Sequence, residues 1–317
     1  MTRAKTKRRG LHQIALAALF TVGNTLLRFP WKNTGAGISI SFPVSAIAAV
    51  CAVALVYPAA GKLLRAPFRK RIPRMIAAGV FCAAVSAVSL FCAARCASDL
   101  LAFFGETLLP RGTEVPFSAL FLAAAVCLAR APRRSTDGFA LIVFFASCVA
   151  VAVLFLRGAP QFRAEYGAVD FSVFSGADVL SGTLWAEVLL PMAPLAVYFG
   201  VTTPRRKGKS VRSPVFGTLA GVGILLVCVL QTLLTFGAEY AAALSYPYSR
   251  AVRVVSVGQY AFRPEILSYL LDYSACLFRT AVCFASVRRL FGRFLPRAAK
   301  WVPALLGLGV FIYLYLR

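Results

Sequence analysis

Histidine and acidic side chains are scarce in this 317-residue chain, and the common catalytic motifs are missing from it. There is one histidine, His12, and there are 11 aspartates and glutamates against 35 lysines and arginines. The sequence has no Ser-His-Asp set, no pair of carboxylates at catalytic spacing and no phosphate-binding loop. These absences argue against an enzyme, and we expect no cofactor.

The cysteines lack the spacing of a metal site or of a disulfide framework. None of them belongs to a Cys-x-x-Cys pair, and His12 has no other ligand type near it in the sequence. All nine lie in apolar runs, at positions 51, 82, 92, 96, 127, 148, 228, 276 and 283. Small side chains in such runs are typical of helix packing, so we expect neither bound metal nor disulfide bonds.

Long apolar runs, by contrast, fill the sequence. Hydrophobic residues make up 60% of the chain, and the mean hydropathy is +0.76. A helix needs about 20 mostly apolar residues to cross the hydrocarbon of a bilayer. The runs predict an all-α polytopic membrane protein, a single bundle over residues 1–317. Its nine helices are expected at 11–29, 37–57, 75–101, 116–131, 139–156, 180–201, 214–237, 264–287 and 300–316.

The net charge of +24 follows the alternation of these predicted connections. The N-terminus and every second connection carry 24 of the 35 basic residues, and the opposite side carries nine. Cytoplasmic loops of membrane proteins are enriched in lysine and arginine, so the pattern predicts a cytoplasmic N-terminus. The basic residues lie in short separate loops without interleaved aromatic residues, which favours attraction to anionic lipid over nucleic-acid binding.

Two of the predicted helices contain polar interruptions. Gly23 weakens the first one, and Asn24 and Thr25 offer side chains that compete for backbone hydrogen bonds. The sixth carries a similar set: Ser181, Gly182, Thr183, Trp185 and Glu187. Unwound backbone at membrane depth is tolerated where it is buried in protein or lines a wet cavity, and paired interruptions mark transporter binding sites. The five-helix offset predicts inverted repeats over about 11–156 and 174–316. A packing glycine at Gly23, and a Glu187 that reaches the membrane surface, are the simpler interpretations.

Further ionisable residues lie inside predicted helices, where they are costly and usually functional. Arg95 and Asp99 are spaced to pair on one face, either in a site or as an anchor at the membrane surface. Asp272 precedes Arg279 by two helical turns, so that a ligand could bridge them. Tyr269 and Tyr273 flank Asp272 and could line a pocket or simply pack between helices.

Three stretches together resemble the B subunit of spore-germination receptors, the GerAB family. They are "ALFTVGNTLLRFP", "GTLWAEVLLPMAPLAVYFGVTTPRRKGK" and the segment from Tyr246 to Gly292, with its "VSVGQY" turn. That family belongs to the amino acid–polyamine–organocation superfamily, and the resemblance implies its LeuT-like inverted-repeat bundle. Family members usually have ten helices, and the tenth is expected to be absent here.

The resemblance implies a germinant sensor in the inner membrane of a spore or in a cell membrane. A small nutrient, typically an amino acid, would bind at the two interruptions in mid-membrane and shift the bundle between two states. The implied partners are the receptor's A subunit and its lipoprotein C subunit. Two alternatives remain open: a permease that moves amino acids with an ion, and a membrane scaffold that binds no ligand.

Overall fold

The chain folds into helices, as the apolar runs predict. The computed structural model describes residues 2–23, 25, 27, 72–110, 112–167, 191–202, 212–256, 265–294 and 296–316, together with isolated positions between 44 and 55. These ranges contain α-helices, short 3-10 helices and turns, and no strand. The predicted all-α class is confirmed for them.

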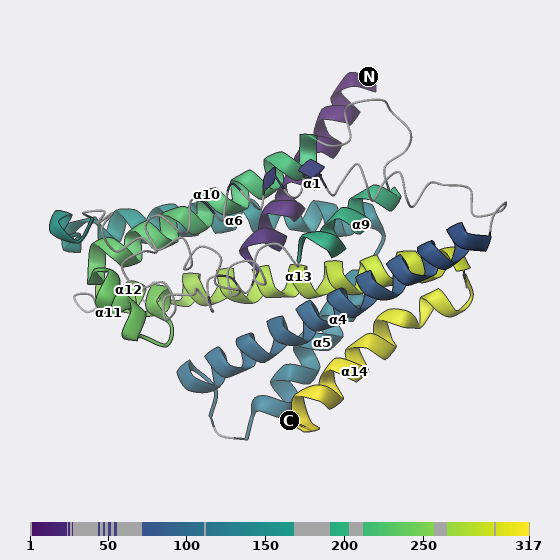
Figure 1. Cartoon of the computed structure of the whole chain (residues 1–317). Coiled ribbons are helices and arrows are strands. Elements are labelled where there is room, and N and C mark those ends of the chain that lie inside the picture. Colours follow the sequence, from purple (N-terminus) through teal and green to yellow (C-terminus); the bar gives the residue numbers. More distant parts are fainter. Residues whose placement is uncertain are drawn as a thin grey trace.

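Eight of the helices form the body of the bundle (Figure 1). They are α1 (Thr2–Val22), α4 (Ile72–Thr107), α5 (Glu114–Arg130), α6 (Arg133–Gly158), α9 (Met192–Thr202), α10 (Arg212–Phe236), α13 (Glu265–Phe294) and α14 (Val302–Leu316). The shorter elements are η2 (Ala159–Gln161), η3 (Ala164–Gly167), α11 (Ala238–Ala243), α12 (Pro247–Ser256) and η5 (Ala298–Lys300). Among the described residues, four helices are long and apolar enough to cross a membrane, as a multi-pass membrane protein requires. They lie within Gly79–Thr107, Arg133–Gln161, Ser213–Phe236 and Glu265–Gly292.

Each of these eight helices overlaps one of the nine predicted spans. The predicted span 180–201 coincides with α9 only from Met192 onward, because residues 168–190 lie outside the described part of the chain. The predicted span 37–57 lies outside it too, apart from isolated positions. Several predicted bounds were wrong. Helix α4 continues beyond position 101 to Thr107, and α13 beyond position 287 to Phe294. Helix α6 begins at Arg133 rather than at position 139, and α1 runs from Thr2 to Val22 rather than over 11–29.

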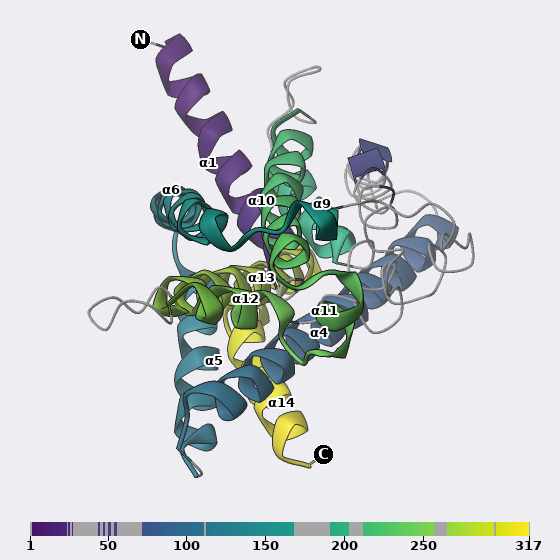
Figure 2. The same cartoon turned by 90° about the vertical axis from the view of Figure 1, so that its left-hand side faces the viewer.

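Helix α13 runs through the middle of the bundle. In the view of Figure 2, helices α1, α6, α9 and α10 lie on one side of α13, and helices α4, α5 and α14 lie on the other. Most of the apolar span of α13 is buried, with Ala275 to Leu290 largely inside the protein. A helix that is covered on all sides is positioned by its neighbours, so its polar side chains face protein rather than lipid.

Helices α4 and α13 pack antiparallel along a seam of small side chains. The seam is marked by a hydrogen bond of 3.2 Å between the Ser89 and Ser286 hydroxyls. Farther along, the Cys96 thiol donates to the Cys276 carbonyl at 3.6 Å. Five cysteines are buried in the structure: 92, 96, 228, 276 and 283. Small residues let helix backbones approach in a membrane protein, so the packing role expected for these five is confirmed.

Two glycines of α10 give α1 its place in the bundle. Ideal Cβ atoms at Gly217 and Gly221 would lie 2.6 Å from the carbonyl oxygens of Ile14 and Ala18 respectively. Such approach is possible only without side chains, as in the Gly-x-x-x-Gly contacts of membrane helices. The inner half of α1 is enclosed as a result: every residue from Ala15 to Val22 is at most 5% exposed.

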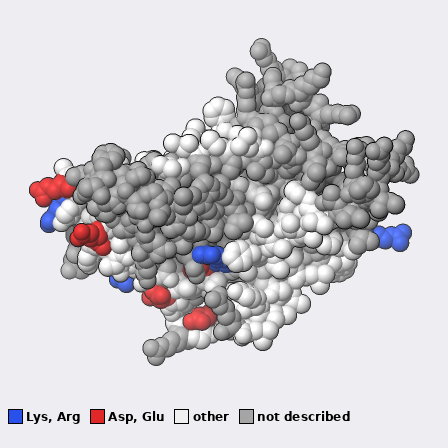
Figure 3. All heavy atoms as spheres, viewed as in Figure 1, with Lys and Arg blue, Asp and Glu red and all other residues white. Residues whose placement is uncertain are grey.

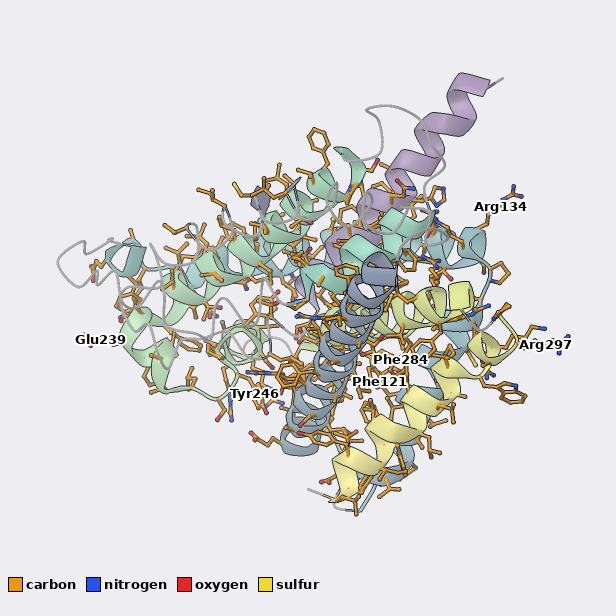
Figure 4. All side chains as sticks on the ribbon, turned by 45° about the vertical axis from the view of Figure 1, so that its right-hand side comes forward. Phe121, Arg134, Glu239, Tyr246, Phe284 and Arg297 are labelled. Carbon is orange, nitrogen blue, oxygen red and sulfur yellow. The ribbon has the colours of Figure 1, made fainter. Side chains whose placement is uncertain are left out.

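Three exposed charged side chains mark the two ends of the bundle. Arg134 and Arg297, from two of the basic connections, lie at one end, and Glu239 lies at the other (Figure 4). Between the ends most described surface atoms belong to uncharged residues (Figure 3). Arg288 and Arg289, assigned to a loop from the sequence, lie within α13 instead. Their guanidinium groups donate to backbone carbonyls of Ala129, Arg130 and Tyr198, so the helix continues through them.

Candidate functional site

The regular part of α1 ends at the interruption that the sequence predicts. The helix stops at Val22, and Gly23 adopts a φ of +37°, a left-handed conformation that side chains disfavour. The Gly23 amide still donates to the Leu19 carbonyl at 3.0 Å, and the Thr25 amide donates to the Val22 carbonyl at 2.9 Å. A glycine at this position ends the helix while closing its last hydrogen bonds.

Arg279 of α13 lies directly against this helix end. Its side chain is 2% exposed, and its Nη1 donates to the Thr25 hydroxyl at 3.5 Å. A Cβ at Gly23 would lie 2.6 Å from the same Nη1, so the arginine occupies the space that the glycine leaves. The guanidinium carbon also lies 5.8 Å from the centre of the Phe20 ring. Arg279 therefore links α13, in the core of the bundle, to the end of α1 at Gly23.

The position of Arg279 suits the electrostatics of a helix terminus. The carbonyl groups at the carboxyl end of a helix carry partial negative charge, and a nearby cation is stabilised by it. Thr21 and Thr25 turn their hydroxyls back onto the Ala17 and Thr21 carbonyls, at 2.8 and 3.3 Å. The Arg279 cation of α13 thus lies beside the polar backbone at the end of α1, inside an apolar bundle.

Asp272 lies on the same helix as Arg279 and is buried as deeply. It is 1% exposed, and its Oδ1 has no hydrogen-bond partner in the described part of the chain. Tyr248, Cys228 and Cys276 lie within electrostatic range of it. The Tyr248 hydroxyl is likewise buried, and the Cys228 thiol, a weak hydrogen-bonding group, lies beside it. Since a buried polar group normally has a partner, Asp272 Oδ1 marks a place where one is needed.

The two predicted pocket tyrosines pack against aromatic rings. Tyr269 makes an edge contact with Phe103 at 5.4 Å between ring centres, and its hydroxyl accepts from Arg253 Nη2 at 2.6 Å. Tyr273 contacts three rings of α4 and α5, those of Phe104, Phe117 and Phe121. In the described part of the chain these tyrosines form the wall between α13 and the pair α4–α5.

Asp99 and Arg95 lie on α4 beside the same stretch of α13. Contacts of α4 on either side of Asp99 (Cys96 with Cys276, and Phe103 with Tyr269) place it near the level of Asp272 in the antiparallel pair. Asp99 is 3% exposed, whereas Arg95 is half-buried and its guanidinium lies 5.9 Å from the centre of the Phe91 ring. The structure therefore brings Asp99 toward the predicted site more clearly than it does Arg95.

The second predicted interruption lies outside the described residues, and so does Asn24. This concerns Ser181, Gly182, Thr183, Trp185 and Glu187. The described chain resumes at Pro191, and α9 follows it from Met192. Arg289 of α13 holds α9: its guanidinium carbon lies 3.7 Å from the centre of the Tyr198 ring, and Nη1 donates to the Tyr198 carbonyl at 2.9 Å. Both α1 and α9 are thus fixed to α13 by an arginine.

The sequence did not indicate the roles of three groups of residues. The contact between Arg279 and Gly23 joins segments more than 250 residues apart, and no local pattern points to it. Tyr248 gave no signal because it belongs to a stretch that was expected to be loop. The glycines of α10 could have been found, because Gly217 and Gly221 form a Gly-x-x-x-Gly pattern in an apolar run.

The site joins an acid, a cation and a helix end in a buried setting. Among the described residues no three histidine, cysteine, aspartate or glutamate side chains come close enough to hold a metal ion. The polar groups present there are those of Asp272, Tyr248, Arg279 and Thr25. No protein-family model matches the chain, and no curated protein sequence matches it.

Proposed function

We propose that the chain is the nutrient-sensing subunit of a spore-germination receptor, and that it binds a small zwitterion such as an amino acid. The site would lie in mid-membrane, between the end of α1 and α13, completed by the second predicted interruption at 180–187. One observation carries the proposal: Asp272 is buried in an apolar helix, and its Oδ1 has no hydrogen-bond partner among the described residues. Ionisable residues placed in this way inside membrane helices are usually functional.

The ammonium group of the ligand would bind Asp272. A carboxylate that is removed from water without a partner carries a large free-energy cost, which a cation and its hydrogen bonds offset. The Tyr248 hydroxyl lies within electrostatic range of Asp272, and its oxygen would be a second acceptor for the ammonium. An amino acid supplies three N–H donors on one carbon atom, enough for both oxygens.

The carboxylate group of the ligand would be attracted to Arg279. Asp272 and Arg279 are separated by about 10 Å along the axis of α13. An arginine side chain spans much of that distance, and its planar guanidinium suits a carboxylate. A zwitterion between the two residues would neutralise the acid and the cation together.

Ligand binding would act by shifting an equilibrium between two arrangements of the bundle. Such a shift requires that the ligand bind one arrangement more tightly than the other. Two arginines of α13 contact neighbouring helices: Arg279 contacts the end of α1, and Arg289 contacts α9. Movement of either helix relative to α13 would change the site, which supports a sensing role for the two contacts.

The proposed setting is the inner membrane of a spore, with the N-terminus in the cytoplasm. The proposed partners are the receptor's A subunit and its lipoprotein C subunit. Affinity purification of the tagged chain from spore membranes tests this, with a tagged unrelated multi-pass protein as the control. Recovery of neither subunit would count against the receptor and in favour of a free-standing protein.

The binding site is tested with purified full-length protein in detergent. The twenty L-amino acids are screened by thermal unfolding, and for each hit the amine without the carboxylate and the acid without the amine are compared. We expect at least one amino acid to raise the Tm, and Asp272→Asn to abolish the effect. Asp137→Asn makes the same change near the start of α6, where Asp137 pairs with Arg133 at 3.2 Å, and should leave it intact.

Two results would remove the proposal. No stabilisation by any amino acid would favour the non-binding scaffold, and equal stabilisation of wild type and Asp272→Asn would move the site elsewhere. A third measurement separates sensor from permease. A sensor in proteoliposomes should bind the amino acid without accumulating it under an imposed sodium or proton gradient, whereas an ion-coupled permease should accumulate it.

A further inference from the structure

An open pocket of about 660 Å³ lies beside α11, whose Glu239 is at the opposite end of the bundle from Arg134 and Arg297 (Figure 4). It is formed where α6 and α10 end and the short elements η2, η3, α11 and α12 gather (Figures 1 and 2). Its lining is Pro160, Gln161, Phe162, Arg163, Tyr166, Thr235, Phe236, Tyr240 and Val254. None of these residues belongs to the proposed nutrient site.

The walls of the pocket are fixed by hydrogen bonds between different elements. The Arg163 amide donates to the Leu234 carbonyl near the end of α10 at 2.9 Å. The Gln161 side chain donates from Nε2 to the Val254 carbonyl of α12 at 3.2 Å. The segment after α6 is therefore tied to α10 on one side and to α12 on the other.

Gly237 completes the shape of the pocket. It has a φ of +75° and connects α10 to α11 without a side chain. The Tyr166 ring covers it, at 3.5 Å from the position that a Cβ would take. The Phe236 and Tyr240 rings meet edge to face at 5.4 Å on either side of the same glycine. The turn at Gly237 therefore positions the Tyr166, Phe236 and Tyr240 rings of the lining.

Among the described residues, the lining contains one cation and no acid. Arg163 Nη1 donates to the Tyr166 hydroxyl at 3.3 Å, and the guanidinium lies 5.6 Å from the centre of that ring. Glu165 and Glu239 lie nearby in sequence but are exposed and do not line the pocket. Together with the hydroxyls of Tyr166 and Tyr240 and the Gln161 amide, Arg163 offers several donors to an anion.

The pocket lies beside the ends of two helices, where a bilayer crossed by them would meet water. Two helices apolar enough to cross a membrane, α6 and α10, end beside it at Gly158 and Phe236. Tyrosine rings are enriched at that level because their bodies are apolar and their hydroxyls are polar. Tyr166 and Tyr240 are 37% and 58% exposed, so the pocket opens outward. An occupant with an anionic head and an apolar body suits both the charge and the depth.

We propose that this pocket binds the headgroup of an anionic phospholipid from the leaflet at this end of the bundle. The phosphate would take donors from Arg163 and the two tyrosine hydroxyls, and the acyl chains would lie along the apolar sides of α6 and α10. A basic side chain near an anionic membrane surface contributes enough for about a fivefold preference over a zwitterionic lipid. Such a lipid would hold the ends of α6, α10 and α12 together.

Native mass spectrometry of the full-length protein tests the site, with phosphatidylglycerol and phosphatidylcholine of identical acyl chains. Wild type should retain one bound phosphatidylglycerol molecule. Arg163→Gln should bind this lipid with an apparent affinity about fivefold lower. Arg157→Gln removes the same charge from an exposed position of α6 outside the pocket, and should keep that lipid. Arg163→Lys keeps the cation and should retain most of the binding.

Several outcomes would overturn the proposal. They are equal retention by Arg163→Gln and Arg157→Gln, equal retention of the two lipids, or release of phosphatidylglycerol by millimolar inorganic phosphate. The last would assign the pocket to a soluble anion. Thermal unfolding without added lipid checks that each variant is folded. If Arg163→Gln does not fold, Tyr240→Ala replaces it, and unchanged phosphatidylglycerol retention in that variant would overturn the proposal as well.

Discussion

Replacement of Gly221 by alanine should destabilise the protein, while the same replacement two residues later should not. A Cβ at Gly221 would lie 2.6 Å from the Ala18 carbonyl oxygen and 2.8 Å from the Thr21 Cβ. A Cβ at Gly223 would meet nothing within 4 Å. Both glycines lie in α10, so Gly221→Ala and Gly223→Ala differ only in what the new methyl group touches.

The expected cost follows from the atoms that must move. An ordinary contact of a Cβ begins at 3.4 Å, so α1 and α10 would have to separate by about 0.8 Å. The obstructing oxygen belongs to the backbone of α1, whose residues from Ala15 to Val22 are enclosed and cannot turn aside as a flexible side chain could. Overpacking of this kind costs about 1–3 kcal/mol. Separation would also weaken the other dispersion contacts along the two helices.

The control variant has the opposite expectation. Alanine stabilises a helix relative to glycine by up to about 1 kcal/mol, so Gly223→Ala should be neutral or slightly stabilising. Unfolding of the purified chain in mixed micelles, titrated with a denaturing detergent and followed by circular dichroism, measures both variants. Equal stability of Gly221→Ala and Gly223→Ala would refute the assigned contact between α1 and α10.

Two further predictions concern the arginines of α13. Gly23→Ala should destabilise the protein by about 1–2 kcal/mol because of the left-handed backbone alone. Displacement of Arg279 should add a further cost, and this further cost should vanish in an Arg279→Ala background. The same detergent titration measures both variants. Arg289→Lys should destabilise the protein by about 1–2 kcal/mol, because lysine cannot both stack on Tyr198 and donate to its carbonyl. The control Arg297→Lys, at an exposed turn, should leave the stability unchanged. Equal effects of the two substitutions would contradict the role given to Arg289.

The positions of the helices could be read from the sequence because apolar runs have a required length. The apolar runs predict the bounds of α5, α6, α10 and α14 within a few residues, except for the start of α6. That helix begins with a polar segment of about one and a half turns, before its apolar run. The predicted span 264–287 ends too early, because the apolar run ends at the charged Arg288 and Arg289. Their long side chains reach carbonyls of neighbouring segments, which lets the helix continue past the apolar run. Hydropathy alone does not detect such contacts.

The site could be predicted only in part, for a different reason. Helical spacing shows which residues share a face of α13, and burial of Asp272 and Arg279 confirms that their face lies inside the bundle. Spacing does not show which helix lies opposite. That Arg279 meets the end of α1, and that Tyr248 of α12 lies near Asp272, depend on how the bundle is packed. The ligand-binding role of these residues stays a prediction.

Small residues decide that packing, and they were the signal least used. In lipid an apolar side chain gains little by leaving the hydrocarbon, so close approach of backbones determines which helices associate. Gly217 and Gly221 allow α10 to approach α1 more closely than alanine would permit, and α1 leads directly to Gly23, which meets Arg279. The contact between Gly23 and Arg279 therefore depends on glycines one helix away. A substitution at Gly221 should disturb Arg279 without touching it.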